Sequence, residues 1–550
     1  MNKSRPFFYY LLVVVTITAM LGGLSLSAAV PLTAANAQPG MQQSVIVQSQ
    51  SADLAAALVE KHGGQVTSRL EIIDGVGAQL SAGALIALRA EPGITRVTEN
   101  AQTELTEFAF DKPSKNPSTD FPDVSGADLA WEQGALGQGI GVAVIDTGID
   151  DKHPGFKKGI NGKKRDMVVA WKDFVDGKKK PVDPNGHGTH IAGIIANAEK
   201  GADGEFNGMA PAVNLIGVRV LDKTGAGDYE KVIQGIQWVL ENKDRYNIRV
   251  MNLSLHSLVQ SPYWADPLDQ AVMRAWAEGI TVVVAAGNNG PNAMTVAVPG
   301  NTPYVITVGA FTDNYTPADW NDDYLADFSA AGPTLDGFVK PDLLAPGAHI
   351  TSTMMPGSYI ARTHDHNWRD GKYFSMAGTS QAAGVVSGAV AQMLSVQPEL
   401  TPDQVKYRLM VTSLPWINTE QTDVLYSVWQ QGAGRLNAYD AAFATDIQGT
   451  ANNGLDITAD LNGTQHFEGF SYFDEATGTF RLHGFEAETG GYGSWAGGYG
   501  SWAGGYGSWA GGYGVWAGQL VDPVFINNFV NGVGPNLATS SATVEWTEEH

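Results

Sequence analysis

The chain of 550 residues contains no cysteine. Disulfide bonds, thiol catalysis and cysteine-ligated metal sites are therefore excluded. Basic residues are also scarce, since 34 lysine and arginine side chains stand against 57 aspartate and glutamate side chains, for a formal charge of −23. This balance argues against nucleic acid or an anionic membrane as a partner and fits a soluble exported protein. The length is too great for one domain and sufficient to bury a large core.

The first 37 residues (1–37) have the composition of a secretory signal peptide. Lys3 and Arg5 make the start basic, and an apolar stretch follows over 11–29. The tripeptide Ala-Asn-Ala at 35–37 then offers a small-residue cleavage site. An uncleaved membrane anchor is the alternative, because the apolar stretch is long. We expect cleavage here and a secreted, extracellular protein.

A segment rich in small apolar residues, 374–394, contains the tripeptide Gly378-Thr379-Ser380. Its composition predicts a buried helix with a serine in the first turn, where free backbone N–H groups favour negative charge. This position suits an attacking hydroxyl and the oxyanion that the attack creates. A lone serine in such a place is more commonly only a helix cap. Two motifs upstream favour the catalytic interpretation.

These two motifs supply an aspartate and a histidine. The β-branched run 141–146 predicts a buried strand of a parallel sheet that ends at Asp146, where a carboxylate needs a partner. The segment 185–193 places His187 between glycines at the start of another helix rich in small residues. Asp146, His187 and Ser380 follow one another in one of the chain orders known for Ser-His-Asp triads.

The motifs together resemble a known family. DTGID (146–150), GHGTH (186–190) and GTSQAA (378–383) resemble the three signature motifs of the subtilisin-like serine proteases, and AAGNNG (285–290) resembles their oxyanion-hole segment. The resemblance covers roughly residues 120–445. It implies that Asp146, His187 and Ser380 form the catalytic triad and that Asn288 binds the oxyanion together with the Ser380 backbone N–H.

The resemblance also implies that substrate pairs in extended form with two exposed backbone edges. The first edge is rich in glycine, as a close backbone approach requires. The second departs from the family, which commonly has glycine where this chain has His256. An imidazole there should narrow or polarise the cleft, and a solvent-facing histidine is the alternative. The expected substrate-binding residues are Gly225, Ala226 and Gly227 on the first edge, Ser254, Leu255 and His256 on the second, and Ala285, Ala286 and Gly287 before Asn288.

The region before the motifs and the region that contains them differ in their pattern of apolar runs. Residues 38–112 alternate strand-like and helix-like runs, which predict a small α+β unit that resembles the inhibitory and chaperone pro-domain of the family. A separate binding module is the alternative for this unit. Residues 113–447 alternate apolar strand-like runs with helical stretches. They predict an α/β fold, a doubly wound parallel sheet with helices on both faces and functional residues at the carboxyl ends of its strands.

The C-terminal extension, 448–550, contains four heptapeptides of the type GGYGSWA over 490–517. Their glycine content disfavours a helix, and their odd period disfavours a regular two-faced strand. We expect a flexible or turn-rich segment whose tyrosines and tryptophans bind a surface or polymer. Since nothing in the extension supplies a triad member, we also expect that a truncation near Gly449 leaves a folded, active domain.

Three departures from the family affect the turn after the nucleophile and the metal sites. Gly384 stands where the family usually has proline, and Gly155 stands where many relatives have an aspartate that binds calcium. His364, Asp365 and His366 superficially resemble a metal cluster, but we favour a surface loop. We expect no cofactor for the chemistry and predict no metal site, while structural calcium at another carboxylate-lined loop stays open.

The favoured function is a secreted serine endopeptidase that acts through an acyl-enzyme and is made as a self-processing precursor. Its partners would be protein or peptide substrates and its own propeptide. An α/β-hydrolase esterase is one alternative, because GTSQA (378–382) nearly matches the G-x-S-x-G motif, but that fold needs its acid and histidine after the serine. The other alternative is a surface-adhesion protein with an inactive protease domain, and the four intact motifs argue against it.

Overall fold

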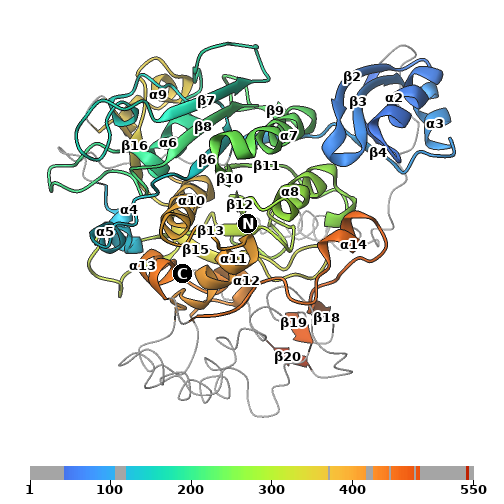
Figure 1. Cartoon of the computed structure of the whole chain (residues 1–550). Helices are drawn as coiled ribbons and strands as arrows, with labels where there is room; N and C mark the ends of the chain where they lie inside the picture. The colour runs from blue at the N-terminus through green and yellow to red at the C-terminus, as the bar shows by residue number, and fades with distance from the viewer. Residues whose placement is uncertain are drawn as a thin grey trace, which may run out of the picture.

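The computed structural model describes residues 42–105, 119–369, 372–416, 425–444, 447–475, 479–483 and 541–543. The expected signal peptide and the heptapeptide repeats lie outside these residues. The described chain forms a small N-terminal unit beside a larger α/β body (Figure 1). None of its described helices is long and apolar enough to cross a membrane.

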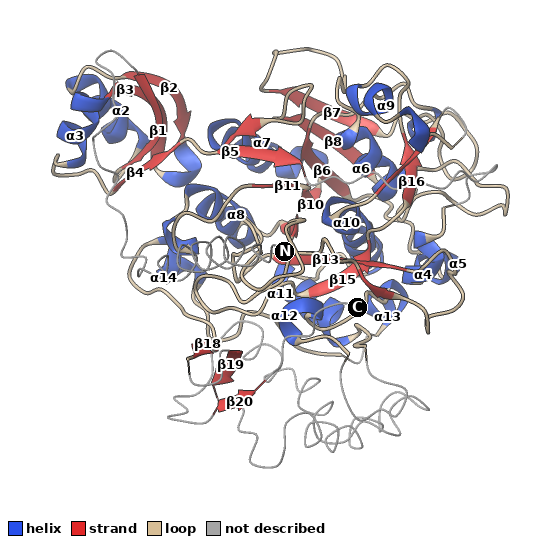
Figure 2. Cartoon of the chain, turned by 180° about the vertical axis from the view of Figure 1, so that it is seen from behind, coloured by secondary structure: helices blue, strands red, loops and turns tan. Residues whose placement is uncertain are grey.

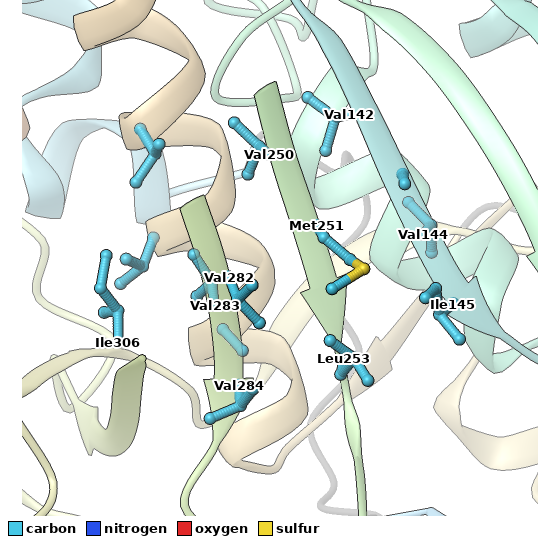
Figure 3. Close-up of a cluster of buried hydrophobic side chains, with 14 of the residues drawn as sticks. Val142, Val144, Ile145, Val250, Met251, Leu253, Val282, Val283, Val284 and Ile306 are labelled. Atoms are coloured by element: carbon cyan, nitrogen blue, oxygen red, sulfur yellow. The ribbon is translucent and has the colours of Figure 1, made fainter. Parts of the chain in front are cut away.

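An eight-stranded sheet forms the centre of the larger body, in the order β14-β13-β12-β10-β6-β8-β7, with β15 beside β13. The paired strands run parallel except at β13–β14. Figure 3 shows valine, isoleucine and leucine side chains of neighbouring strands packed together. The strands are β6 (Gly141–Asp146), β7 (Val168–Asp173), β8 (Asn214–Arg219), β10 (Ile248–Leu253), β12 (Thr281–Ala285), β13 (Ile306–Thr312), β14 (Tyr324–Leu325) and β15 (Leu343–Pro346).

Two helix pairs pack on this sheet, α6 with α10 and α7 with α8. The small residues of α10 allow a close approach, since a Cβ at Gly388 would lie 2.3 Å from Met209 Cβ. A parallel sheet flanked by helices confirms the α/β fold that the alternation of runs predicts. The main helices are α6 (His187–Ala196), α7 (Tyr229–Tyr246), α8 (Pro267–Ala277), α10 (Thr379–Val396) and α11 (Pro402–Val411).

Shorter elements complete the body. Among them, β16 and β17 pair antiparallel. The short helices are α4 (Phe121–Ser125), α5 (Ala127–Glu132), η2 (Pro154–Phe156), η3 (Tyr263–Ala265), α9 (Tyr359–Thr363), η4 (Asp365–Asn367), α12 (Val428–Gln431), α13 (Ala438–Phe443) and α14 (Ile457–Leu461). The remaining strands are β16 (Ile350–Thr353), β17 (Tyr373–Met376), β18 (Ser471–Asp474), β19 (Thr479–His483) and β20 (Ser541–Thr543).

The N-terminal unit is an antiparallel sheet in the order β2-β3-β1-β4, with two helices on it. Serine side chains cap both helices, since Ser51 accepts a hydrogen bond from Leu54 N and Ser81 accepts one from Ala84 N. The unit has an apolar core of its own, separate from that of the body. Its elements are β1 (Gln42–Gln48), α2 (Ala52–Lys61), β2 (Gln65–Leu70), η1 (Glu71–Ile73), β3 (Gly75–Ser81), α3 (Ala82–Arg89) and β4 (Arg96–Glu99).

The N-terminal unit rests on α7 and α8 of the body (Figures 1 and 2). Ile72 and Ile73 of η1 pack against the core of the body. Polar pairs surround this contact, among them Arg274 Nη2 with Asp74 Oδ2 at 3.1 Å. Ile46 and Leu70 belong to the same cluster, so the unit contacts the body through a small apolar patch around η1 with polar pairs at its rim.

Past residue 447, where the sequence predicts the end of the catalytic domain, the chain stays packed on the body. The Asn452 side chain donates hydrogen bonds to Tyr304 O at 3.1 Å and to Asp403 Oδ1 at 2.6 Å. Asp460 Oδ2 accepts hydrogen bonds from the hydroxyls of Tyr263 at 2.6 Å and Tyr304 at 3.0 Å. Composition alone does not reveal these buried polar contacts, so the packed body reaches further than the sequence predicts.

Candidate active site

Asp146 and His187 lie against each other at one edge of the sheet. Asp146 is the last residue of β6 and His187 is the first residue of α6, and neither side chain is exposed. His187 Nδ1 lies 2.8 Å from Asp146 Oδ1 and 2.9 Å from Oδ2. Because an ionised carboxylate can only accept, Nδ1 carries the proton and Nε2 keeps its lone pair in the neutral ring. This is the tautomer that a general base needs.

A second buried carboxylate, Asp183, holds the loop that precedes His187. Its Oδ1 accepts hydrogen bonds from the Thr147 hydroxyl at 2.9 Å and from Gly186 N at 2.8 Å. Its Oδ2 accepts hydrogen bonds from the backbone N–H and the hydroxyl of Thr189. Asp183 thus joins the residue after Asp146 to the first turn of α6. The sequence motifs do not predict this role for Asp183, and its only local signal is an aspartate four residues before His187.

Ser380 is the second residue of α10 and lies at the same edge of the sheet. Its Oγ donates to Ser254 O at 3.2 Å, and Ser254 Oγ donates to Ser380 O at 2.9 Å. Ser254 directly follows β10, whose Leu253 pairs with Ile145 of β6. Helices α6 and α10 pack together as well. The structure therefore brings the three predicted triad residues to the carboxyl ends of neighbouring strands, as expected for this fold.

The amide of Asn288 is held in one orientation beside the nucleophile. Its Oδ1 accepts hydrogen bonds from Thr379 N at 2.9 Å and Thr379 Oγ1 at 2.8 Å. A backbone N–H can only donate, so the oxygen must face Thr379 and the Nδ2 group faces the other way. Asn288 Nδ2 is buried and has no hydrogen-bond partner among the described residues. A buried donor without an acceptor next to Ser380 fits an oxyanion site.

An extended segment of the chain, β5 (Gln102–Leu105), lies between the two predicted backbone edges. It pairs antiparallel with β11 (Leu255–His256) and with β9 (Gly227–Asp228). At the first edge, Gly225 has a φ of 86°, a conformation that favours glycine, and a Cβ there would lie 2.7 Å from Leu105 Cδ1 of β5. The two edges therefore hold an extended segment of the chain itself as the middle strand of a three-stranded sheet.

Comparison with known proteins agrees with this geometry. The sequence profile of the subtilase family matches residues 137–451. The chain belongs to the subtilase family. It is 42% identical to serine protease AprX of Bacillus subtilis (strain 168) over 311 residues, which make up 56% of this chain and 66% of that protease. It is 35% identical to subtilisin DY of Bacillus licheniformis over 318 residues, or 58% of this chain and 95% of that protein.

A solved structure supports the fold of this subtilase. Fervidolysin from Fervidobacterium pennivorans, a keratinolytic enzyme related to subtilisin, aligns with a TM-score of 0.55 and 24% sequence identity. The alignment covers 74% of this chain and 62% of fervidolysin. At this identity the likeness shows the fold alone. Membership of the subtilase family supports a serine endopeptidase activity.

Three predicted residues of this subtilase make no pair with β5, which pairs only with β9 and β11 in the described part of the chain. Ala285 and Ala286 are buried, the first at the end of β12. Gly287 has a φ of 112° and donates its N–H to Thr379 Oγ1 at 3.2 Å. On the first edge, Ala226 closes a turn with Asp222. In this structure, Ala285, Ala286 and Gly287 lead from β12 to Asn288 without pairing with β5, and Ala226 lies in the turn before β9.

His256 is buried in this subtilase and pairs with Glu104 on the neighbouring strand β5. Its side chain is 8% exposed, and its Nε2 lies 3.7 Å from Glu104 Oε1. Burial lowers the pKa of the His256 imidazole, and the Glu104 carboxylate opposes this shift. The imidazole therefore lies next to the side chain of the residue that pairs with it on β5.

The other departures from the family have steric or local explanations. A Cβ at Gly155 would lie 2.4 Å from Asn197 Oδ1, so an aspartate ligand does not fit there in this backbone. A Cβ at Gly384 would lie 3.2 Å from Ile194 Cγ2, so this glycine serves the tight contact between α10 and α6. His366 is exposed and His364 is partly exposed, which agrees with a surface loop.

Proposed function

We propose that this subtilase is a secreted serine endopeptidase that hydrolyses peptide bonds through an acyl-enzyme on Ser380. The observation that carries the proposal is the buried Asn288 Nδ2, which has no acceptor in the described structure and is fixed beside Ser380 by Thr379. A hydrolytic oxyanion would supply this acceptor. An esterase of the α/β-hydrolase fold would have its acid and histidine after the serine, whereas Asp146 and His187 precede Ser380. An inactive adhesion protein would leave this buried donor without an acceptor.

In the proposed reaction, Ser380 Oγ attacks the scissile carbonyl while His187 Nε2 takes its proton. The imidazolium is stabilised by Asp146, which already contacts Nδ1 with both oxygens. Asn288 Nδ2 and the Ser380 backbone N–H donate to the oxyanion. His187 then protonates the leaving amine, and a water molecule hydrolyses the acyl-enzyme by the same steps in reverse.

We propose further that the protein is made as a precursor that processes itself. What supports this is the position of β5, which fills both backbone edges and directly follows the N-terminal unit in the chain. A segment in this place excludes other peptides. The same arrangement would present the chain after β5 to the protein's own catalytic residues, so that the first substrate of Ser380 is intramolecular.

A covalent fluorophosphonate probe tests the proposed function on the purified protein. We expect the probe to label Ser380, found by peptide mapping, and to abolish cleavage of a protein substrate at the same stoichiometry. Labelling with ester hydrolysis but no peptide cleavage would favour an esterase. Absence of labelling in protein freed of its N-terminal unit would favour an inactive domain.

A further inference from the structure

A group of three potential metal ligands, two of them buried and one partly buried, lies outside the active site. It consists of Asp120, Asp313 and His349, whose nearest ligand atoms lie within 4.8 Å of one another. Asp120 precedes α4, Asp313 follows β13, and His349 precedes β16. No residue of this group takes part in the proposed reaction. The three residues are far apart in the sequence and form no motif, so the sequence alone does not predict them as metal ligands.

One oxygen of this group has no partner. Asp313 is 4% exposed; its Oδ1 lies 2.5 Å from His349 Nε2, and its Oδ2 makes no hydrogen bond in the described structure. Within the described residues, the Asp313 carboxylate therefore makes no hydrogen bond outside the group. A buried carboxylate oxygen without a donor is costly, and a bound cation would remove that cost.

The imidazole of His349 is held so that Nε2 faces the two carboxylates. Its ring stacks on Tyr315, with 3.8 Å between ring centroids, and its Nδ1 lies 3.4 Å from Thr312 Oγ1. His349 also has a φ of 44°, a strained conformation for a residue other than glycine. Support at the far nitrogen is the usual way in which a ligating histidine is oriented.

We propose that Asp120, Asp313 and His349 bind a divalent transition-metal ion, with Zn²⁺ as the best match. An imidazole nitrogen with carboxylate oxygens suits zinc better than calcium or magnesium, which prefer oxygen ligands alone. Ligand atoms on one zinc ion lie at most about 4.2 Å apart, so small movements of the present side chains suffice. The ion would take the place of the direct contact between His349 and Asp313, and water would complete its coordination.

The proposed ion joins the start of the catalytic body to its sheet. Asp120 lies within residues 113–447, which the sequence assigns to the catalytic domain, so we expect it to stay with the catalytic body once the N-terminal unit is cleaved. Asp313 lies in the loop that follows β13, and His349 lies in the loop that precedes β16. The ion therefore acts as a structural clamp, and its loss should lower the thermal stability without changing the groups of the triad.

The test is zinc binding to the untagged full-length chain after chelation and removal of the chelator. We expect one Zn²⁺ per chain by mass spectrometry of the desalted protein, and a melting temperature several degrees higher at a zinc concentration about 100-fold above Kd. The variants His349→Asn and Asp313→Asn should each weaken zinc binding on the order of 100-fold. Calcium at the same concentration should give no comparable shift.

Two control variants separate this site from other candidates. Asp123→Asn changes an exposed acidic group formed with Asp128 and Glu205, and His366→Asn changes the surface loop. Both controls should keep full zinc binding, and loss of binding in either one would overturn the proposal. If His349→Asn fails to fold, X-ray absorption on the wild-type protein decides. One imidazole with oxygen ligands supports the site; two imidazoles, no imidazole, or no bound zinc overturns it.

Discussion

The two segments that flank the catalytic body are attached to it in different ways. The N-terminal unit has its own apolar core and touches the body through η1 and a polar rim. The segment 447–475 instead contributes Phe467 and the carboxylate of Asp460 to the interior of the body. The first arrangement suits a part that folds by itself and is removed, and the second suits a part that must stay.

The largest expected effect concerns the removable segment. Ser380→Ala should leave the N-terminal unit covalently attached, because the proposed cleavage needs the protein's own nucleophile. The measurement is intact mass after purification without added protease. Maturation of Ser380→Ala to the wild-type mass would show that another protease removes the unit.

Asn288→Ala should slow both maturation and peptide turnover by about 100- to 1000-fold, as is typical for loss of one oxyanion donor. Asn289→Ala is the matched control, since Asn289 is exposed and adjacent. Rates of propeptide release and of peptide hydrolysis are compared for both variants. An equal loss in the control, or none in Asn288→Ala, would remove Asn288 from the proposed mechanism.

The segment past residue 447 should prove necessary for stability, contrary to the expectation from sequence. A truncation at Gly449 deprives the hydroxyls of Tyr263 and Tyr304 of their acceptor, Asp460. Each unsatisfied group costs about 1–3 kcal/mol, so we expect a melting temperature lower by roughly 10 °C. A truncation after residue 483, which removes the repeats, is the control and should melt near the full-length value. Equal melting temperatures of the two truncated proteins would show that the catalytic domain ends near residue 447, as the sequence predicts.

The affinity of the N-terminal unit for the cleaved enzyme should fall at low pH. In the complex, burial is the larger cause and lowers the pKa of His256, while Glu104 of β5 opposes this shift. We expect that release of β5 exposes the imidazole to water, so that the free enzyme takes up a proton at a higher pH than the complex does. As pH falls through the ordinary histidine value, about 6.5, binding of the unit should weaken several-fold. Inhibition constants of the isolated unit between pH 5 and 8 measure this effect. His256→Gln should remove it, and an unchanged slope would exclude His256.

The smallest effect is expected at the rim of the same contact. Arg274→Ala removes a partly exposed ion pair with Asp74. Because such pairs contribute at most about 1 kcal/mol, affinity for the N-terminal unit should fall by less than about fivefold. A larger loss of affinity in the same inhibition assay would mean that the polar pairs, and not the apolar contact at η1, contribute most of the binding free energy.

Features that depend on residues close together in the sequence could be predicted, and features that depend on contacts between distant residues could not. The strands that end at Asp146 and before Ser254 follow from local apolar runs, and the motifs around His187 and Ser380 from short spacing. Asp183 acts through contacts that only the folded loop creates. The same holds for Asp460, whose partners lie more than a hundred residues away. A polar residue in a loop carries no local signal of such a partner.

Because β5 lies as a middle strand between β9 and β11, a protein substrate must be locally unfolded before it can bind in the same way. A peptide held as β5 is held offers backbone groups to β9 and to β11 at once. A segment within a helix or a sheet already uses those groups, so it must first be released from its own structure. Cleavage of a native protein should therefore follow the local opening equilibrium of the target, and frayed ends and loose loops should be cut first.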